Sequence, residues 1–262
     1  MHPALWIAKT GLEAQTKNLA VISNNLANAG TVGFKRDRVV FEDLFYQNIR
    51  QSGAQSSADT QLPSGLQIGT GTKVVATQKQ HQQGSFQTSS SQLDMAIQGN
   101  GFFQITMPDG TTSYTRAGNF ALDNAGQIVT AGSGYVLQPA ITVPSNTTSL
   151  DIAIDGTVTV QEQGTAAPTN LGTINIATFV NPAGLQAVGE NLFVETGSSG
   201  TPVVGTPGLD GVGQLRGGQL ETSNVSSVEE LVALIETQRT YETNAKVLSA
   251  VDKMLQFVNQ TL

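Results

Sequence analysis

The sequence predicts a mixed, mainly β fold, in which an antiparallel all-β middle region is flanked by N- and C-terminal α-helices that pair as a coiled coil. Two observations support this prediction. Apolar residues recur with helical spacing at both ends of the 262-residue chain, and turn sequences separate short alternating segments in its middle. No helical pattern interrupts the middle, so its strands are expected to form a unit of their own.

Residues 1–30 have the pattern of an amphipathic helix. The spacing of the apolar positions alternates between three and four, which is a heptad seam with Gln15 in one gap. These positions are Leu5, Ala8, Leu12, Leu19, Ile22 and Leu26. Asn28 or Gly30 is expected to adopt the left-handed conformation that closes the helix.

Residues 224–262 predict a second, longer helix. Ser226 and Ser227 each precede a glutamate by three residues, which gives two possible registers of a capping box. One apolar row repeats every seven residues, at Leu234, Tyr241, Leu248, Leu255 and Leu262. We expect its companion row to be mixed, and to consist of Leu231, Gln238, Ala245, Asp252 and Asn259.

Residues 76–204 are expected to form the antiparallel β domain. Segments 102–107 and 111–116 flank a Pro-Asp-Gly turn, and two further hairpins are expected around Asn124 and Asp155. Residues 174–180 and 192–195 complete the pattern of strands. The turns predict antiparallel pairing and leave both a barrel and a sandwich open.

The stretches 31–75 and 205–223 are interpreted as connecting regions. The first includes an extended loop at 49–72, which is rich in Gly and Ser and has little periodicity. Loops of this length in a compact protein are either functional or flexible.

The helical ends are expected to be surfaces for self-association. The alternative is that the apolar rows of both helices face the core of an ordinary globular domain. However, pairing along one seam leaves further apolar residues uncovered, and an uncovered set of this size marks an association surface. These residues are Trp6, Ile7, Val21, Ile235, Val247, Val251 and Val258.

Composition excludes several classes of function. The formal net charge is −7, whereas a nucleic-acid-binding protein needs a basic surface. There is no cysteine, so the chain has no disulfides and no thiolate metal sites. We expect no membrane insertion, because no apolar run approaches the roughly 20 residues of a spanning helix, and no cleaved signal peptide.

The sequence does not support an enzymatic activity, a cofactor or a metal. His2 and His81 have no nearby second ligand, and His81 is expected to be a surface residue. Asp109, Asp123 and Asp155 stand at turns, where an aspartate usually bonds the local backbone. A pair of catalytic carboxylates of the glycosidase type is the less favoured interpretation of these acids.

Two long motifs at the ends of the chain resemble the signatures of the bacterial flagellar rod and hook proteins. They read SNNLANAGTVGFKR at residues 23–36 and LETSNVSSVEELVALIETQRTYETNAKVLSAVDKML at residues 220–255. The residues that match the N-terminal signature are Asn24, Asn25, Leu26, Asn28, Thr31, Gly33, Phe34 and Lys35. Those that match the C-terminal signature are Ser223, Asn224, Val225, Gln238, Arg239, Tyr241 and Asn244. Within this family, the chain most resembles the subunits of the distal rod over essentially its full length.

The resemblance implies a structural subunit that assembles with copies of itself into a straight, rigid helical tube. The tube would carry motor torque through the periplasm to the hook and serve as an export channel. The implied partners are proximal rod proteins, the hook protein, the bushing rings of the basal body and the flagellar export apparatus. Export would need no cleaved signal. The residues expected at the subunit interface are Leu5, Leu12, Leu19, Ile22, Leu26, Leu234, Tyr241, Leu248 and Leu255.

Three alternatives remain open from the sequence. The nearest is a hook or proximal rod subunit of the same family. The others are a secreted hydrolase of cell-wall glycan and a free-standing adhesin, although the chain shows neither paired acids nor a surface anchor.

Overall fold

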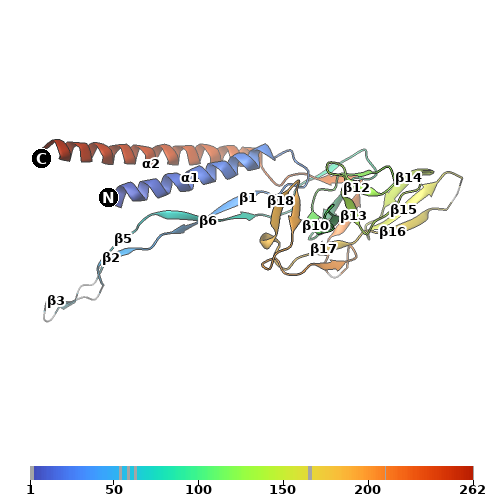
Figure 1. Ribbon diagram of the computed structural model, residues 1–262, viewed down its shortest axis with the longest axis horizontal. Helices are drawn as coiled ribbons and strands as arrows, with labels where there is room; N and C mark the ends of the chain where they lie inside the picture. The colour runs from blue at the N-terminus through green and yellow to red at the C-terminus, as the bar shows by residue number, and fades with distance from the viewer. Residues whose placement is uncertain are drawn as a thin grey trace. The chain divides into compact units, whose positions relative to one another are not determined.

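The computed structural model describes residues 3–52, 55–57, 60–61, 64–164, 167–209 and 211–261 (Figure 1). The chain divides into two compact units, each described here by itself. The helix–ribbon unit comprises Met1–Ala27, Asp37–Gln78 and Ser226–Leu262. The β unit comprises Asn28–Arg36 and Lys79–Val225.

Two helices form the larger part of the helix–ribbon unit. α1 (Pro3–Ala27) and α2 (Ser227–Thr261) lie side by side and antiparallel, so both chain ends are found at the same end of the pair (Figure 1). This confirms the paired terminal helices. Within the described residues, neither helix combines the length and the apolarity needed to cross a membrane.

The end of α1 differs from the expected left-handed closure. Neither Asn28 nor Gly30 has a positive φ, and the first residue after the helix that does is Gly33, at 70°. Instead, the Thr31 N–H donates to the Asn28 carbonyl at 3.1 Å, and the Thr31 hydroxyl donates to the Asn28 side chain at 3.1 Å. A tight turn closed by a side chain therefore replaces the glycine cap.

A two-stranded antiparallel ribbon completes this unit. Its successive pairs are β1 (Asp37–Asp43) with β6 (Thr72–Lys79), β2 (Gln47–Arg50) with β5 (Leu66–Ile68), and β3 (Gln55–Ser57) with β4 (Thr60–Gln61). Much of the stretch 49–72, expected to be an extended loop, is thus strand. Its polar composition gave no alternating signal, because a ribbon held by backbone hydrogen bonds does not require an apolar face.

The β unit is built on one sheet of nine strands. The order along it is β11-β12-β13-β9-β10-β19-β18, and β17 pairs with both β9 and β20. The strands are β9 (Phe102–Thr106), β10 (Thr112–Thr115), β11 (Phe120–Leu122), β12 (Ile128–Thr130), β13 (Val136–Gln138), β17 (Ile176–Thr178), β18 (Gln186–Gly189), β19 (Leu192–Val194) and β20 (Val203–Gly205). A short 3₁₀ helix, Pro182–Gly184, precedes β18.

Smaller sheets complete the unit. They are β14 (Thr147–Ile152), β15 (Thr157–Glu162) and β16 (Thr169–Thr173) in one sheet, β8 (Met95–Gln98) with β21 (Gln214–Gly217), and β7 (Phe86–Thr88) with β22 (Gln219–Glu221). The pairs β9–β10, β11–β12 and β14–β15 are antiparallel, which confirms the three hairpins expected from the turns. The stretch 205–223, expected to be a connection, carries β21 and β22.

The interior of the β unit is a large apolar cluster. Fully buried side chains such as Met95, Phe103, Ile128 and Leu215 come from different sheets and meet there. Burying each of them contributes roughly 1.5–3 kcal/mol. The β unit therefore has a complete core of its own, and this core supports the polar network described below.

Candidate functional sites

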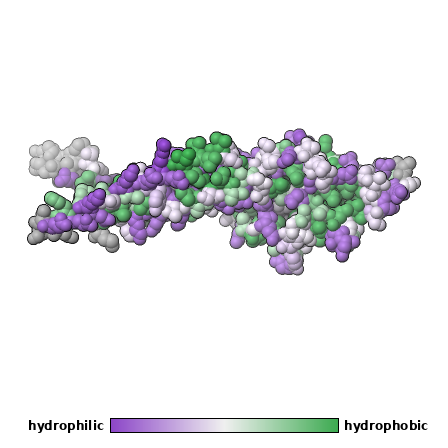
Figure 2. Space-filling model, turned by 90° about the horizontal axis from the view of Figure 1, so that it is seen from above, coloured by the Kyte–Doolittle hydropathy of each residue, from purple (hydrophilic) through white to green (hydrophobic). Residues whose placement is uncertain are grey.

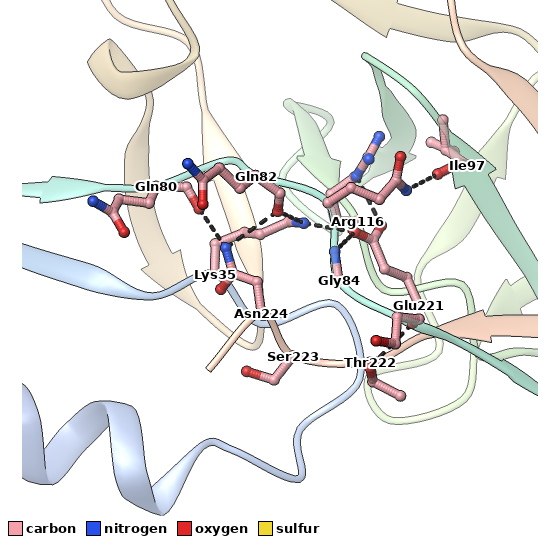
Figure 3. A network of polar contacts seen from close by, with 12 residues as sticks. Lys35, Gln80, Gln82, Gly84, Ile97, Arg116, Glu221, Thr222, Ser223 and Asn224 are labelled. Carbon is pink, nitrogen blue, oxygen red and sulfur yellow. Dashed lines mark hydrogen bonds and ion pairs between the residues drawn. The ribbon is translucent and has the colours of Figure 1, made fainter. Parts of the chain in front are cut away.

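A buried ion network lies within the β unit (Figure 3). Lys35 Nζ contacts Glu221 Oε1 at 2.6 Å, and Arg116 Nε contacts Glu221 Oε2 at 3.0 Å. All three side chains are almost completely shielded from solvent. Burial lowers the pKa of Lys35 and of Arg116, and the carboxylate of Glu221 opposes both shifts.

Backbone groups supply the remaining partners of these charges. Lys35 Nζ donates to the Gln82 carbonyl at 2.7 Å, and the Gly84 N–H donates to Glu221 Oε1 at 2.9 Å. The two terminal nitrogens of Arg116 donate to the carbonyls of Gly101 and Gly99, at 2.7 and 2.8 Å. Because each charge has hydrogen-bonding partners, the network ties distant segments of the chain together rather than leaving a reactive group available.

Two glycines let the backbone approach this network closely. Gly33 has a φ of 70°, and a Cβ at this position would lie 2.5 Å from the Ala117 nitrogen. A Cβ on Gly84 would lie 2.0 Å from the Thr222 carbonyl oxygen. Only glycine fits at either position, which gives Gly33 of the N-terminal signature a structural role.

Asn224 links the same segments beside the ion network (Figure 3). Its Oδ1 accepts a hydrogen bond from the Arg36 N–H at 2.8 Å, and its Nδ2 donates to the carbonyls of Gln80 and Gln82 at 2.8 and 3.1 Å. The Gln80 N–H also donates to the Arg36 carbonyl at 2.8 Å. The Asn224 amide thus bridges two chain segments where no regular strand pairing joins them.

His81 lies against this region and corrects an expectation. We expected a surface histidine, but the ring is packed edge-on against Phe102 and Phe193, with centroid separations of 5.4 and 5.6 Å. Burial, together with the nearby charges of Lys35, Arg116 and Lys79, lowers its pKa to about 4. The imidazole is therefore neutral at physiological pH.

The candidate carboxylates have local, structural partners. Oδ1 of Asp109 accepts from the Thr111 N–H at 3.0 Å, and Oδ1 of Asp155 accepts from the Thr157 N–H at 3.0 Å. Oδ1 of Asp123 accepts from the Asn124 N–H at 2.7 Å. Within the described part of the chain, no three His, Asp or Glu side chains gather in a way that would hold a metal ion.

The expected interface residues lie on and beside the contact between α1 and α2. Ile22 is buried in it, and Tyr241 is 43% exposed. The remaining expected interface residues are half-buried: Leu5, Leu12, Leu19, Leu26, Leu234, Leu248 and Leu255. Each of these leucines therefore keeps a minor part of its surface accessible.

The companion row of α2 was predicted in the wrong position. Leu231 is 48% exposed, and Gln238 is exposed as well. The row that packs into the helix pair lies one residue earlier and consists of Glu230, Thr237, Asn244 and Val251. Three of these four residues are polar, so a search for apolar repeats could not find this row. Val251 was expected to be uncovered, but it is buried, at 6% exposed.

An apolar surface lies on the outer side of α2. Val228, Val232 and Ile235 occupy successive turns and are 72%, 60% and 51% exposed. Figure 2, a view onto the helices, shows hydrophobic side chains gathered over the half of the pair where α1 ends and α2 begins. A groove of about 530 Å³ continues this surface along α2, between Val232 and Asn244.

Family models match three parts of the chain. Residues 5–35 match the model described as flagella basal body rod protein. Residues 216–261 match the C-terminal model of the flagellar basal body rod FlgEFG proteins, and residues 96–160 match the D1 domain model of the flagellar hook protein FlgE/F/G.

Full-length relatives agree with these matches. The chain is 53% identical over 260 residues to the flagellar basal-body rod protein FlgG of Buchnera aphidicola subsp. Acyrthosiphon pisum, covering 99% of this chain and 100% of the relative. It is 47% identical to the protein of the same name from Caulobacter vibrioides, with 98% of both chains covered. The chain belongs to the flagellar basal-body rod protein family. The Bacillus subtilis protein of the same name is 37% identical, with 98% of this chain and 97% of the relative covered.

The ion network draws one residue from each region that matches a family model. Lys35 lies in the first region, Arg116 in the middle region and Glu221 in the last. Lys35 belongs to the N-terminal rod-protein signature, whereas Arg116 and Glu221 were not predicted as site residues. No local pattern in the sequence signals these two residues, because only the fold brings them together.

The other signature residues of this rod-protein family member have varied surroundings. Asn25, Gly33, Phe34, Lys35 and Ser223 are buried. Leu26, Asn28, Thr31, Asn224, Val225 and Asn244 are half-buried, and Asn24, Gln238, Arg239 and Tyr241 are exposed. Among the exposed members, Arg239 lines the groove beside Val232 and Ile235.

Proposed function

We propose that this chain is a non-enzymatic structural subunit of the distal part of the flagellar rod, and that its copies stack into a straight, hollow helical tube. One observation carries the proposal. The outer side of α2 presents apolar side chains on successive turns, and no described residue of the helix–ribbon unit covers Val228, Val232 and Ile235.

Burial of this surface between copies would drive assembly. Each aliphatic side chain removed from water contributes roughly 1.5–3 kcal/mol. In our proposal, the helices at residues 1–30 and 224–262 form the inner wall of the tube. The proposed interface residues are the half-buried leucines beside the seam, together with Ile22 and Tyr241. Contacts that repeat from head to tail produce an open helical polymer rather than a closed ring.

The tube would transmit motor torque through the periplasm to the hook, since many repeated contacts share the load along its length. It would also leave a central channel for export. The partners that we propose are proximal rod proteins, the hook protein, the bushing rings of the basal body and the flagellar export apparatus. We propose that the subunit itself reaches this location through that apparatus, without cleavage of a signal peptide.

The alternatives have less support. A hook or proximal rod subunit would share the helix pair, and the shape of the polymer distinguishes it from the distal rod. A glycan hydrolase is not supported, because the relatives are named as rod proteins and the candidate acids bond their local backbone.

Electron microscopy of the purified protein, concentrated until it assembles, tests the proposal. We expect straight hollow tubes. Curved tubes would favour the hook alternative, and a protein that stays monomeric at every concentration would contradict self-assembly.

A paired substitution tests the surface of α2. Val232→Ser combined with Ile235→Ser should abolish the tubes, because it removes two exposed apolar side chains from the proposed interface. Val180→Ser is the matched control, since it changes an exposed valine of the β unit. If both variants lose the tubes equally, or both keep them, this surface is not the interface.

A further inference from the structure

A polar row runs along the contact between α1 and α2. Asn25 Nδ2 donates to Glu230 Oε2 at 3.4 Å, and Asn18 Nδ2 donates to Thr237 Oγ1 at 3.2 Å. One heptad further along, a Cβ added to Gly11 would lie 3.2 Å from Asn244 Nδ2. Each heptad step towards the start of α1 is therefore matched by a heptad step towards the end of α2.

Two further hydrogen bonds hold Asn25, the α1 member of the first pair, in place. Asn25 Nδ2 donates to the Asp37 carbonyl at 2.9 Å, and the Asp37 N–H donates to Asn25 Oδ1 at 2.9 Å. Asn25 and Glu230 are each 1% exposed. This single asparagine therefore joins the end of α1, the start of β1 and the start of α2.

Gly11 adds a steric component to the row. Glycine in the interior of a helix is unfavourable relative to alanine, so its position in the middle of α1 needs a reason. The close approach of the Asn244 amide supplies one, because a larger side chain at position 11 would displace that amide.

We infer that this polar row selects the register and the orientation in which α1 and α2 pair. The apolar rows cannot do so, because Leu5, Leu12, Leu19 and Leu26 repeat every seven residues and a slip of one heptad replaces each leucine with the next. The same slip can set Asn18 opposite Glu230, or Asn25 opposite Thr237, but either direction loses one native pair. In the first slip Asn25 faces position 223, before the start of α2, and in the second Glu230 faces position 32, beyond the end of α1. A buried polar residue in a helix seam specifies one register because other registers leave polar groups without good partners, at some cost in stability.

The choice of register and orientation matters because helices from two copies of the chain could also pair with each other. Two copies of α1 present the same leucine rows to each other, and their association would also separate Asn25 from Glu230. The row favours α1 with α2, antiparallel and in one register, over these alternatives. This inference does not depend on the proposed tube, because the contacts lie within one chain.

Engineered disulfides can test the register directly. The chain has no cysteine, so a designed pair forms without competing thiols. Gly11→Cys with Asn244→Cys reports the native register, and Gly11→Cys with Val251→Cys reports a slip of one heptad. Both pairs are placed in full-length protein that keeps Asn18, Asn25, Glu230 and Thr237, and in the variant Asn18→Leu, Asn25→Leu, Glu230→Leu and Thr237→Leu. Mild oxidation in dilute solution traps even a transient helix pair, and mass spectrometry quantifies the two cross-links.

With the native row, we expect the native cross-link to exceed the slipped one by at least roughly tenfold. With the four leucines, the ratio should fall to within roughly threefold, because the row then repeats one residue and no longer distinguishes the registers. The control is Thr16→Leu with Thr243→Leu, which places leucines at exposed positions of the same two helices and should leave the ratio unchanged.

Several results would overturn the inference. These are an unchanged ratio in the leucine variant, an equal drop in the control, or no native cross-link with the native row. If the leucine variant associates with other copies, Asn18→Ala, Asn25→Ala, Glu230→Ala and Thr237→Ala remove the same hydrogen bonds without adding apolar surface and must lower the ratio. Failure to form tubes would contradict the proposed function but would leave this result unaffected.

Discussion

The two units of the chain use apolar residues in opposite ways. The β unit buries large aliphatic and aromatic side chains such as Phe103 and Ile128 in a continuous core. Among the described residues of the helix–ribbon unit, the buried apolar side chains are Ala8, Ala14, Ile22, Val39 and Val251. Its large apolar side chains include exposed ones, with Phe45 94% and Val228 72% exposed. The β unit is complete in one chain, whereas the helix–ribbon unit presents surface that further copies can bury.

Disrupting the ion network should produce the largest change in the β unit. Glu221→Gln removes the carboxylate charge that pairs with both Lys35 and Arg116, and removing one partner of a buried ion pair costs about 3–5 kcal/mol. We expect a corresponding fall in the free energy of unfolding, measured by urea denaturation with hydrogen exchange on β9 and β19.

Glu195→Gln is the matched control, because this glutamate is exposed and should have little effect. Comparable losses in both variants would show that the network does not stabilise the β unit. Trp6, the one tryptophan of the chain, reports separately on the helix–ribbon unit and should keep its fluorescence in Glu221→Gln.

Acidification should destabilise the β unit through His81. Its pKa in the folded protein is lowered from 6.5 to about 4, so the unfolded chain binds a proton in a range where the folded chain does not. The stability contributed by the neutral ring is full above pH 6.5 and is lost as the pH falls from there towards 4. The loss should amount to roughly 3 kcal/mol.

The variant His81→Phe isolates this effect, because it keeps an aromatic ring between Phe102 and Phe193 and removes the titrating group. The difference in unfolding free energy between the natural chain and the variant should change with pH only between about 6.5 and 4. A difference that stays constant across this range would show that His81 titrates normally in the folded protein.

Shortening the ribbon should have the smallest effect on the β unit. Deletion of residues 49–65 removes strand that lies outside that unit, so we expect its free energy of unfolding to change by less than about 0.5 kcal/mol. Electron microscopy of the assembled variant should instead show altered curvature or stiffness of the polymer. Unfolding of the β unit in this variant would show that the ribbon belongs to its core.

The sequence predicted those parts of the fold that depend on local chemistry. Turn residues such as Asp109 and Asp155 located hairpins, and the heptad leucines located both helices. The ribbon was missed, because short polar strands carry no alternating signal. Lys35, Arg116 and Glu221 form their network only after folding, since Lys35 and Glu221 are 186 positions apart.

The polar row was missed for a different reason. Gly11, Asn18 and Asn25 recur every seventh residue, as do Glu230, Thr237 and Asn244, so the spacing was visible in the sequence. A seam is normally sought as apolar residues, and this search selected Leu231 and Gln238 one position away. A search for polar residues at heptad spacing, run in parallel, would have found the register.

Hydrogen exchange on the dilute and the assembled protein tests most directly whether the helix–ribbon unit is completed by other copies. We predict that amides of the β unit are protected in both states. Amides of α1 and α2 should exchange rapidly in the dilute protein and become protected on assembly, because a narrow helix pair gains too little burial to offset the entropy of ordering. Equal protection of both helices in the dilute and concentrated protein would contradict the account.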